Sequence, residues 1–301
     1  MSWRSVVISR PARLQRDKFA LLIKQEQSVR VPFEDIAIIV LNHREIALTH
    51  PVLSACGEYG ISLFATDGAH HPSGVFLPYL QHSRATRWLR KQLAASRPLA
   101  KQTWAAIVRQ KIANQGHCLD LAGAEGGAQL ASYARQVCSG DSTLMESQAA
   151  AFYFSRLFGA RFRRSQLTWT NAALNYGYAI LRGAIARGLV AHGFFPSIGL
   201  KHASEQNAFN LADDLIEPFR PLVDLYVITN RIDDLRDLIP SDKASLVSLL
   251  NVDMDMPRGK MSALAAIEHT VESLARVLDQ GREKHLELPE MIGLEQHVAG
   301  N

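Results

Sequence analysis

The sequence predicts an α+β protein, in which a small N-terminal β-rich domain is followed by a larger C-terminal α-helical domain. The first eighty residues consist of short β-branched or apolar runs separated by polar, glycine or proline residues, which is typical of strands. After Gln81, apolar residues recur at intervals of three and four, the period of amphipathic helices. A length of 301 residues is enough for two domains.

Five runs in the first part are expected to be strands, with one helix among them. The runs are residues 5–9, 28–32, 35–41, 61–66 and 74–77. The helix is expected over residues 52–59, because Thr49 can cap it, Pro51 suits its first turn and Gly60 can end it.

The second part contains four segments with helical periodicity: residues 88–93, 104–112, 149–157 and roughly 262–278. Residues 116–127 are rich in Gly and Ala, and we expect a loosely structured connection there. The predicted domains are residues 1–81 (β-rich) and 82–282 (helical), with residues 283–301 as a mobile tail.

The composition is that of an ordinary globular protein. Hydrophobic residues make up 47% and charged residues 21%, which excludes a largely disordered or fibrous chain. The longest apolar runs are far shorter than the roughly 20 residues that span a bilayer. The chain opens without a secretory signal pattern, and its three widely spaced cysteines indicate reduced thiols, so we expect a cytoplasmic location.

Basic residues are segregated along the chain, whose net charge is +4. Acidic residues are absent between Asp67 and Asp120 and again from Ser147 to Ser204. A segregated basic surface favours a nucleic acid partner, because each Lys or Arg placed on a phosphate releases counterions. The alternative is a set of helix faces whose partner acids lie elsewhere in the fold. The residues expected to bind DNA are Arg84, Arg87, Arg90, Lys91, Arg161, Arg163, Arg164 and Arg182.

The sequence contains no Walker loop, dinucleotide-binding glycine pattern, nucleophile elbow or HExxH motif. Chemistry is instead suggested by Asp214 and Glu217. If residues 211–217 are helical, both carboxylates project on one face, where they repel each other unless a cation lies between them. Pro218 and Pro221 then end or kink the helix and would open a site.

His202 lies on a glycine-containing turn and could bring an imidazole to the same place. Two carboxylates and one imidazole suit Mg²⁺ or Mn²⁺. Taken alone, His202 is more simply a core or loop histidine, and the two acids could equally form a solvated helix face near an N-terminus.

Glu146 is the third candidate ligand, as the last acid before a long acid-free stretch and the head of an apolar helix. Thr143 and Glu146 also fit a capping box, in which the glutamate only satisfies a backbone N–H.

Three segments, residues 171–187, 196–202 and 207–221, together resemble the CRISPR-associated integrase family Cas1, the universal spacer-acquisition family. The resemblance extends over most of the chain, including Trp3-Arg4-Ser5-Val6 and residues 32–44. Within the family, the chain is similar to the short type II form. It implies an N-terminal β domain for dimerisation and partner contacts and a helical catalytic domain. Implied partners are double-stranded DNA (prespacer and CRISPR repeat), a second copy of the chain and a Cas2 dimer in a heterohexamer, with Cas9 as an additional candidate.

The resemblance also implies a metal site for Mg²⁺ or Mn²⁺ made by Glu146, His202 and Glu217. Asp214 matches a further acid beside that site. Many members carry Asp where this chain has Glu217, which leaves open whether Glu217 or Asp214 is the closer ligand. The implied reaction is integration of prespacer DNA into a CRISPR array, by attack of its 3′-hydroxyls on the repeat borders. A non-catalytic DNA-binding scaffold and a stand-alone structure-specific metal-dependent nuclease are the alternatives.

Overall fold

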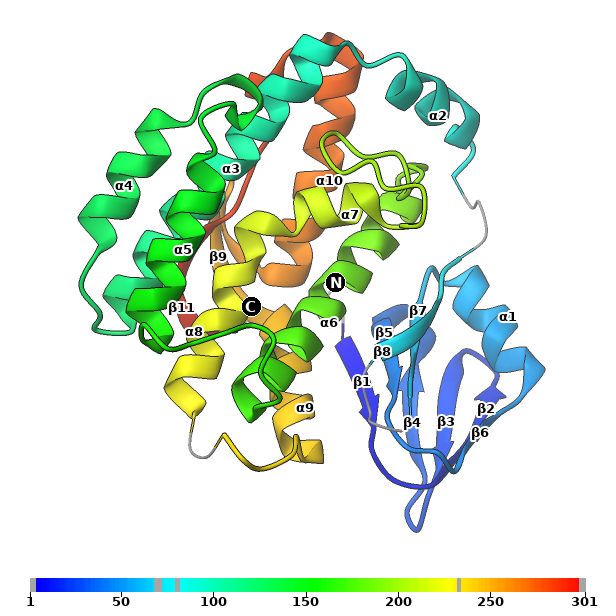
Figure 1. Ribbon diagram of the computed structural model, residues 1–301. Helices are drawn as coiled ribbons and strands as arrows, with labels where there is room; N and C mark the ends of the chain where they lie inside the picture. Colours follow the sequence, from blue (N-terminus) through cyan, green and yellow to red (C-terminus); the bar gives the residue numbers. More distant parts are fainter. Residues whose placement is uncertain (1–3, 68–71, 79–81, 232–233, 298–301) are drawn as a thin grey trace.

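The structure, a computed structural model, describes residues 4–67, 72–78, 82–231 and 234–297. Its strands gather mainly in the N-terminal part, and helices form most of the remainder (Figure 1), which confirms the predicted α+β class. Of the residues that carried the resemblance, Trp3 lies outside the described residues.

In the described N-terminal residues, eight strands form two sheets. The first has the order β1-β5-β7-β8, with β1 (Arg4–Ile8), β5 (Ile36–Leu41), β7 (Ser62–Thr66) and β8 (Pro72–Phe76). The second has the order β4-β3-β2-β6, with β2 (Ala12–Asp17), β3 (Ala20–Lys24), β4 (Val29–Pro32) and β6 (Ile46–Leu48). Strand β5 pairs in parallel with β1 and β7, and its residues 36–40 are all buried, as expected for a central strand covered on both faces.

All five predicted strands are present, and the predicted helix is α1 (His50–Glu58). Strands β2, β3 and β6 were missed. In β2 only Ala12 and Leu14 face the core, so the apolar alternation is too short to stand out from its charged neighbours.

The helices of the second part include every helix that the sequence predicts. They are α2 (Ala85–Leu93), α3 (Arg97–Leu121), α4 (Gly127–Gln136), α5 (Met145–Phe158), α6 (Trp169–Ala191), α7 (Asn210–Leu215), α8 (Arg220–Asn230), α9 (Pro240–Ser248) and α10 (Ala263–Gln280). Short 3-10 helices are η1 (Phe33–Asp35), η2 (Ser139–Asp141), η3 (Glu217–Phe219), η4 (Leu249–Asn251) and η5 (Glu283–His285).

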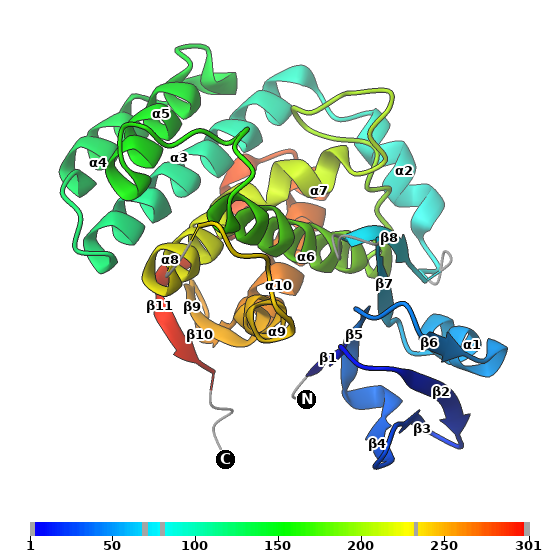
Figure 2. The ribbon, with the colours of Figure 1, turned by 60° about the horizontal axis from the view of Figure 1, so that its bottom comes forward.

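Helix α6 runs through the middle of the helical part, with α8, α9 and α10 around it (Figure 2). Its small residues permit this close packing. A Cβ at Gly177 would lie 2.5 Å from Cγ1 of Val223 in α8, and a Cβ at Gly183 would lie 1.9 Å from Cζ of Phe64 in β7. Helix α6 therefore joins the helical core to the N-terminal sheet.

The expected loose connection over residues 116–127 was drawn too long, because only residues 122–126 connect the two helices. Helix α3 continues to Leu121, and α4 begins at Gly127. Gly116 lies inside α3, where an added Cβ would be 3.5 Å from the carbonyl oxygen of Gly127. The glycine that suggested a break serves instead to let α3 and α4 approach each other.

The expectation of a mobile tail from residue 283 was also wrong for the described residues. Strand β11 (Glu290–Gln296) pairs with β9 (Val252–Met256), which also pairs with β10 (Gly259–Ser262). Met291 is buried, and its N–H donates to Oδ1 of Asn114 in α3 at 3.1 Å. Pairing with a distant strand holds a segment whose own sequence has little apolar periodicity.

The domain boundary predicted between residues 81 and 82 borders residues 79–81, which lie outside the described residues, so it stays a prediction. In the parts of the chain that are described, no helix is both long and apolar enough to cross a membrane.

Candidate metal centre

Glu146 stands in the first turn of α5, and Asp141 determines where that helix begins. The N–H groups of Met145 and Glu146 donate to Oδ1 and Oδ2 of Asp141 at 2.9 and 3.1 Å. Asp141 is buried and has a φ of 52°. The cap is therefore the Asp141 carboxylate and not a box between Thr143 and Glu146, and the carboxylate of Glu146 is directed elsewhere.

Glu217 opens the 3-10 helix η3 and is only 5% exposed. Its Oε1 accepts a hydrogen bond from Nε of Arg220 at 3.0 Å, and its Oε2 lies 2.6 Å from Nζ of Lys111. Burial alone would raise the pKa of Glu217, but the positive charges of Lys111 and Arg220 outweigh it and hold that pKa below its usual value.

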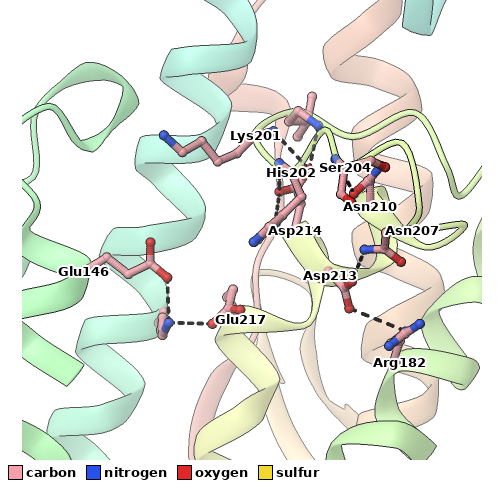
Figure 3. A network of polar contacts seen from close by, with 12 residues as sticks. Glu146, Arg182, Lys201, His202, Ser204, Asn207, Asn210, Asp213, Asp214 and Glu217 are labelled. Carbon is pink, nitrogen blue, oxygen red and sulfur yellow. Dashed lines mark hydrogen bonds and ion pairs between the residues drawn. The ribbon is translucent and has the colours of Figure 1, made fainter. Parts of the chain in front are cut away.

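Lys111 of α3 joins the two glutamates. Its Nζ donates to Oε1 of Glu146 at 2.8 Å and lies beside Glu217, so that the two carboxylates face each other across one ammonium group (Figure 3). Burial would lower the pKa of Lys111, but the charges of Glu217 and Glu146 raise it overall. Helices α3 and α5 and the turn η3 thus bring two acids from distant parts of the chain to one cation.

Asp214 does not share a face with Glu217, contrary to the sequence prediction. Its Oδ2 accepts the N–H groups of Leu200 and Lys201 at 2.5 and 3.1 Å, and its Oδ1 accepts the N–H of His202 at 3.1 Å. The predicted pairing fails because the two carboxylates have separate partners, which are backbone N–H groups for Asp214 and the side chains of Lys111 and Arg220 for Glu217. The assumed helix over residues 211–217 is also interrupted, because α7 ends at Leu215 and Glu217 begins η3.

His202 is oriented by the same buried carboxylate. Its Nδ1 lies 2.8 Å from Oδ1 of Asp214, which accepts the ring proton and leaves Nε2 as the nitrogen that can reach a ligand. The hydrogen bond with Asp214 raises the pKa of His202, burial partly opposes this, and the charges of Asp214 and Glu217 raise it further. The imidazole and the ring of Trp104 also lie edge to face, with 5.8 Å between their centroids.

The turn that carries His202 depends on a glycine. A Cβ at Gly199 would lie 2.2 Å from the carbonyl oxygen of His202 and 2.9 Å from Oδ2 of Asp214. The turn borders an open cavity of about 350 Å³, whose lining includes His202, Asn207 and Asn210. The imidazole is therefore fixed on one side and accessible on the other.

The residues present fit a hard divalent cation in part. Two carboxylates converge on one positive charge, and the buried Oε2 of Glu217 has the ammonium group of Lys111 as its recorded partner, at 2.6 Å. His202 presents an imidazole held by a carboxylate, a common arrangement for a metal-binding histidine. Within the described ranges, however, no three His, Cys, Asp or Glu side chains stand together as a ready metal-binding group. The structure thus unites Glu146 with Glu217, holds His202 separately, and uses the oxygens of Asp214 for other contacts.

The predicted DNA-binding residues fall into two groups. Arg84, Arg90, Arg161 and Arg163 are exposed and have no acidic or amide side-chain partner recorded among the described residues. The others have such partners, although Arg87 and Arg164 are exposed as well. Arg87 and Lys91 form ion pairs with Asp279 of α10 at 2.8 and 2.6 Å, as the alternative of partner acids elsewhere in the fold requires. The guanidinium group of Arg164 donates to the side-chain oxygens of Asn171 and Asn175. Nε of Arg182 lies 3.5 Å from Oδ1 of Asp213, an ion pair.

The sequence analysis missed Lys111, Asp141 and Arg220. Lys111 carried a usable signal, because it follows the apolar residues Trp104 and Ile107 at helical spacing and so continues a face expected to be buried. A lysine on a buried face requires an anionic partner. Neither Asp141 nor Arg220 had a comparable signal.

Fold and site together define an α+β protein whose helical part joins two glutamates through one lysine and holds a histidine against a separate buried aspartate. Comparison with known proteins identifies the group to which it belongs. The family model described as CRISPR associated protein Cas1 matches residues 6–234, so the chain belongs to the Cas1 family.

The chain is 44% identical over 303 residues to the CRISPR-associated endonuclease Cas1 of Neisseria meningitidis serogroup C, covering 99% of both chains. It is 33% identical to CRISPR-associated endonuclease Cas1 1 of Thermus thermophilus, covering 72% of this chain and 71% of that one. Among solved structures it resembles a casposase bound to integration product, with a TM-score of 0.75, 19% identity and coverage of 94% and 92%. A Cas1 protein from Thermotoga maritima gives a TM-score of 0.72, 20% identity and coverage of 92% and 97%.

Proposed function

We propose that this protein is a metal-dependent DNA integrase and endonuclease that inserts prespacer DNA into a CRISPR array by 3′-hydroxyl transesterification. The observation that carries the proposal is the convergence of Glu146 and Glu217 on one cation position, in a helical domain that also presents His202 with its Nδ1 fixed by Asp214. Membership of the Cas1 family and the endonuclease names of its relatives support the same activity.

Glu146, Glu217 and Nε2 of His202 would hold the ion, Mg²⁺ or Mn²⁺, with Asp214 as the residue that orients the imidazole. When bound, such an ion supplies charge stabilisation at the phosphate and activation of the attacking oxygen. Arg220 keeps Glu217 ionised and in place through its bond to Oε1. Since the reaction exchanges one phosphodiester bond for another, it needs no nucleotide hydrolysis, which agrees with the absence of a P-loop motif.

The proposed partners are double-stranded DNA, a second copy of the chain and a Cas2 dimer, with Cas9 as an additional candidate. A casposase bound to integration product supports the DNA partner. A Cas6-RT-Cas1–Cas2 complex supports the association with Cas2; that match has a TM-score of 0.71 and 17% identity and covers 99% of this chain and 36% of the other. Exposed Arg84, Arg90, Arg161 and Arg163 are the first candidates for phosphate contacts.

The test is strand joining on a branched half-site DNA by the purified full chain with Mg²⁺ or Mn²⁺. Wild-type protein should join strands. His202→Ala and Glu146→Ala should lower the joining rate by about 100-fold or more, the scale expected when charge stabilisation is removed, while DNA affinity and melting temperature stay close to wild type. His50→Ala, at an exposed position at the start of α1, is the matched histidine control and should keep full activity.

Three outcomes would contradict the proposal. Joining by His202→Ala or Glu146→Ala at the wild-type rate would remove the site assignment. Cutting without joining would indicate a stand-alone nuclease. DNA binding with neither reaction, in a metal-supplemented and folded wild-type protein, would indicate a scaffold.

A further inference from the structure

Lys111 occupies the position between the two carboxylates that the proposed metal ion would need. Its Nζ is 2.8 Å from Oε1 of Glu146 and 2.6 Å from Oε2 of Glu217, and the residue is only 9% exposed. Oε1 of Glu146 on α5 and Oε2 of Glu217 on η3 are thus brought together by the ammonium group of Lys111. Lys111 therefore contacts the same donor atoms that would hold the ion.

The charges around Glu217 balance with Lys111 in place. Glu146 and Glu217 carry two negative charges, and Lys111 and Arg220 carry two positive charges. A divalent ion added to this set would leave a surplus of two positive charges beside a carboxylate that is 5% exposed, whereas exchange of the ion for the ammonium group would leave a surplus of one. Burying an unbalanced charge is costly, so the ion and the ammonium group exclude each other from this position.

We propose that Lys111 is a positioning residue that acts as a resident counter-ion, so that divalent metal is loaded by exchange with its ammonium group. This inference rests on the proposed function, because it takes Glu146 and Glu217 as metal ligands. While no metal is bound, Lys111 holds the two carboxylates at one place and prevents their repulsion. It lowers the affinity for the ion in return, because the ion must displace it.

A purely structural lysine makes a different prediction. If Lys111 only supported the fold, its removal would loosen the site and weaken metal binding. If it is a competing counter-ion, a neutral side chain of similar length should leave both carboxylates available and strengthen metal binding. The direction of the change in metal affinity therefore separates the two roles.

The experiment measures Mn²⁺ binding to the full chain by titration calorimetry and electron paramagnetic resonance, without DNA. Lys111→Met should bind Mn²⁺ about tenfold more tightly than wild type, as expected when a competing cation is removed from a partly buried site. In chelator it should melt at a lower temperature than wild type, and Mn²⁺ should raise its melting temperature more than it raises that of wild type.

Three further variants serve as controls. Lys111→Arg keeps the positive charge and should keep the wild-type affinity. Lys101→Met removes an exposed lysine from the same helix and should also leave the affinity unchanged, which separates the local effect from net charge. Lys111→Gln is a neutral, polar replacement for use if Lys111→Met does not fold, and it should bind Mn²⁺ more tightly than wild type.

Equal or weaker Mn²⁺ binding by folded Lys111→Met or Lys111→Gln, with clear binding by wild type, would overturn the inference and leave the proposed function intact. Absence of Mn²⁺ binding by wild type and by both neutral variants would instead contradict the metal site itself.

Discussion

At the scale of single residues, buried carboxylates arrange the groups that would meet the substrate. Asp214 accepts three backbone N–H groups and the ring proton of His202, so one side chain fixes both the turn and the imidazole. Acceptors of this kind determine which nitrogen of a histidine faces a ligand.

Asp214→Asn should impair the site with little change in size. An amide offers one oxygen where the carboxylate offers two, so its NH₂ group must face N–H donors of residues 200–202. We expect metal affinity or joining activity to fall by about 10- to 100-fold, the usual cost of losing such a partner. Mn²⁺ titration and joining rates would measure this, and Asp213→Asn, with the same chemical change next to it, is the control. Wild-type metal affinity in a folded Asp214→Asn would refute this role.

The sequence offered Glu146 as the last acid before a long acid-free stretch, His202 on a glycine-containing turn and Glu217 before two prolines, and the family resemblance joined the three into one site. It could not predict that Asp214 and Glu217 have different partners, since those of Asp214 come from residues 200–202 and those of Glu217 from α3 and α8. It also did not reveal the partners of Glu146, because Lys111 and Asp141 reach it through the packing of α3 and η2.

At the scale of elements, the start of α5 controls the position of Glu146. Two N–H groups of its first turn end on Asp141, and no other acceptor for them is recorded among the described residues. An uncapped first turn frays, and Glu146 lies within it.

Asp141→Gly tests this arrangement without backbone strain, because glycine accepts the positive φ that Asp141 adopts. Loss of the cap should lower the free energy of unfolding by roughly a few tenths of a kcal/mol, the usual cost of replacing a capping residue by glycine, and should reduce joining activity as Glu146 moves. Urea unfolding and joining rates would show both effects. Asp141→Asn keeps one acceptor oxygen and tolerates the same φ. Its unfolding free energy and its joining rate should therefore lie between those of wild type and Asp141→Gly. Unchanged activity in Asp141→Gly would mean that the cap does not position Glu146.

Elements with strong periodicity were predictable and those defined by distant contacts were not. The middle of α3 (residues 104–112), helix α10 and the buried strand β5 follow from apolar spacing alone. Gly116 and strand β11 misled the prediction because their roles depend on α4 and β9, which the local sequence does not contain. The same dependence explains why β2 and β3, which pair with each other in a sheet with charged outer positions, were missed.

At the scale of the whole molecule, a buried network links the helical core to the candidate site. Asp224 of α8 accepts hydrogen bonds from the hydroxyl groups of Tyr153 in α5, at 2.9 Å, and Tyr178 in α6. The ring of Tyr178 lies 4.6 Å from the guanidinium carbon of Arg220, which in turn holds Glu217. The carboxylate of Asp224 thus connects α5, α6 and α8, and it is linked to Glu217 through Tyr178 and Arg220.

This carboxylate should make stability depend on pH. Burial raises the pKa of Asp224 to about 6 from 3.8, although the hydroxyl groups of Tyr178 and Tyr153 and the charges of Arg220 and Arg164 oppose the increase. In the unfolded chain the group loses its proton near pH 4, and in the folded chain near pH 6. Between these values the folded state binds more protons, so the Asp224 contribution to stability decreases as pH rises from 4 to 6 and stays lower above that.

The size of the effect is about 3 kcal/mol for a shift of about two units, and Asp224→Asn should abolish it. The variant can still accept from one tyrosine through its oxygen and donate to the other through its amide, so it should fold. We expect the difference in unfolding free energy between wild type and Asp224→Asn to change by this amount between pH 7 and pH 4, with wild type gaining as pH falls. Urea unfolding at half-unit pH steps would measure it.

Glu125→Gln, at an exposed position, should follow the wild-type profile. Parallel profiles for wild type and Asp224→Asn would mean that the carboxylate of Asp224 titrates alike in the folded and unfolded chain, so that its hydrogen bonds and the nearby positive charges fully offset the cost of burying it.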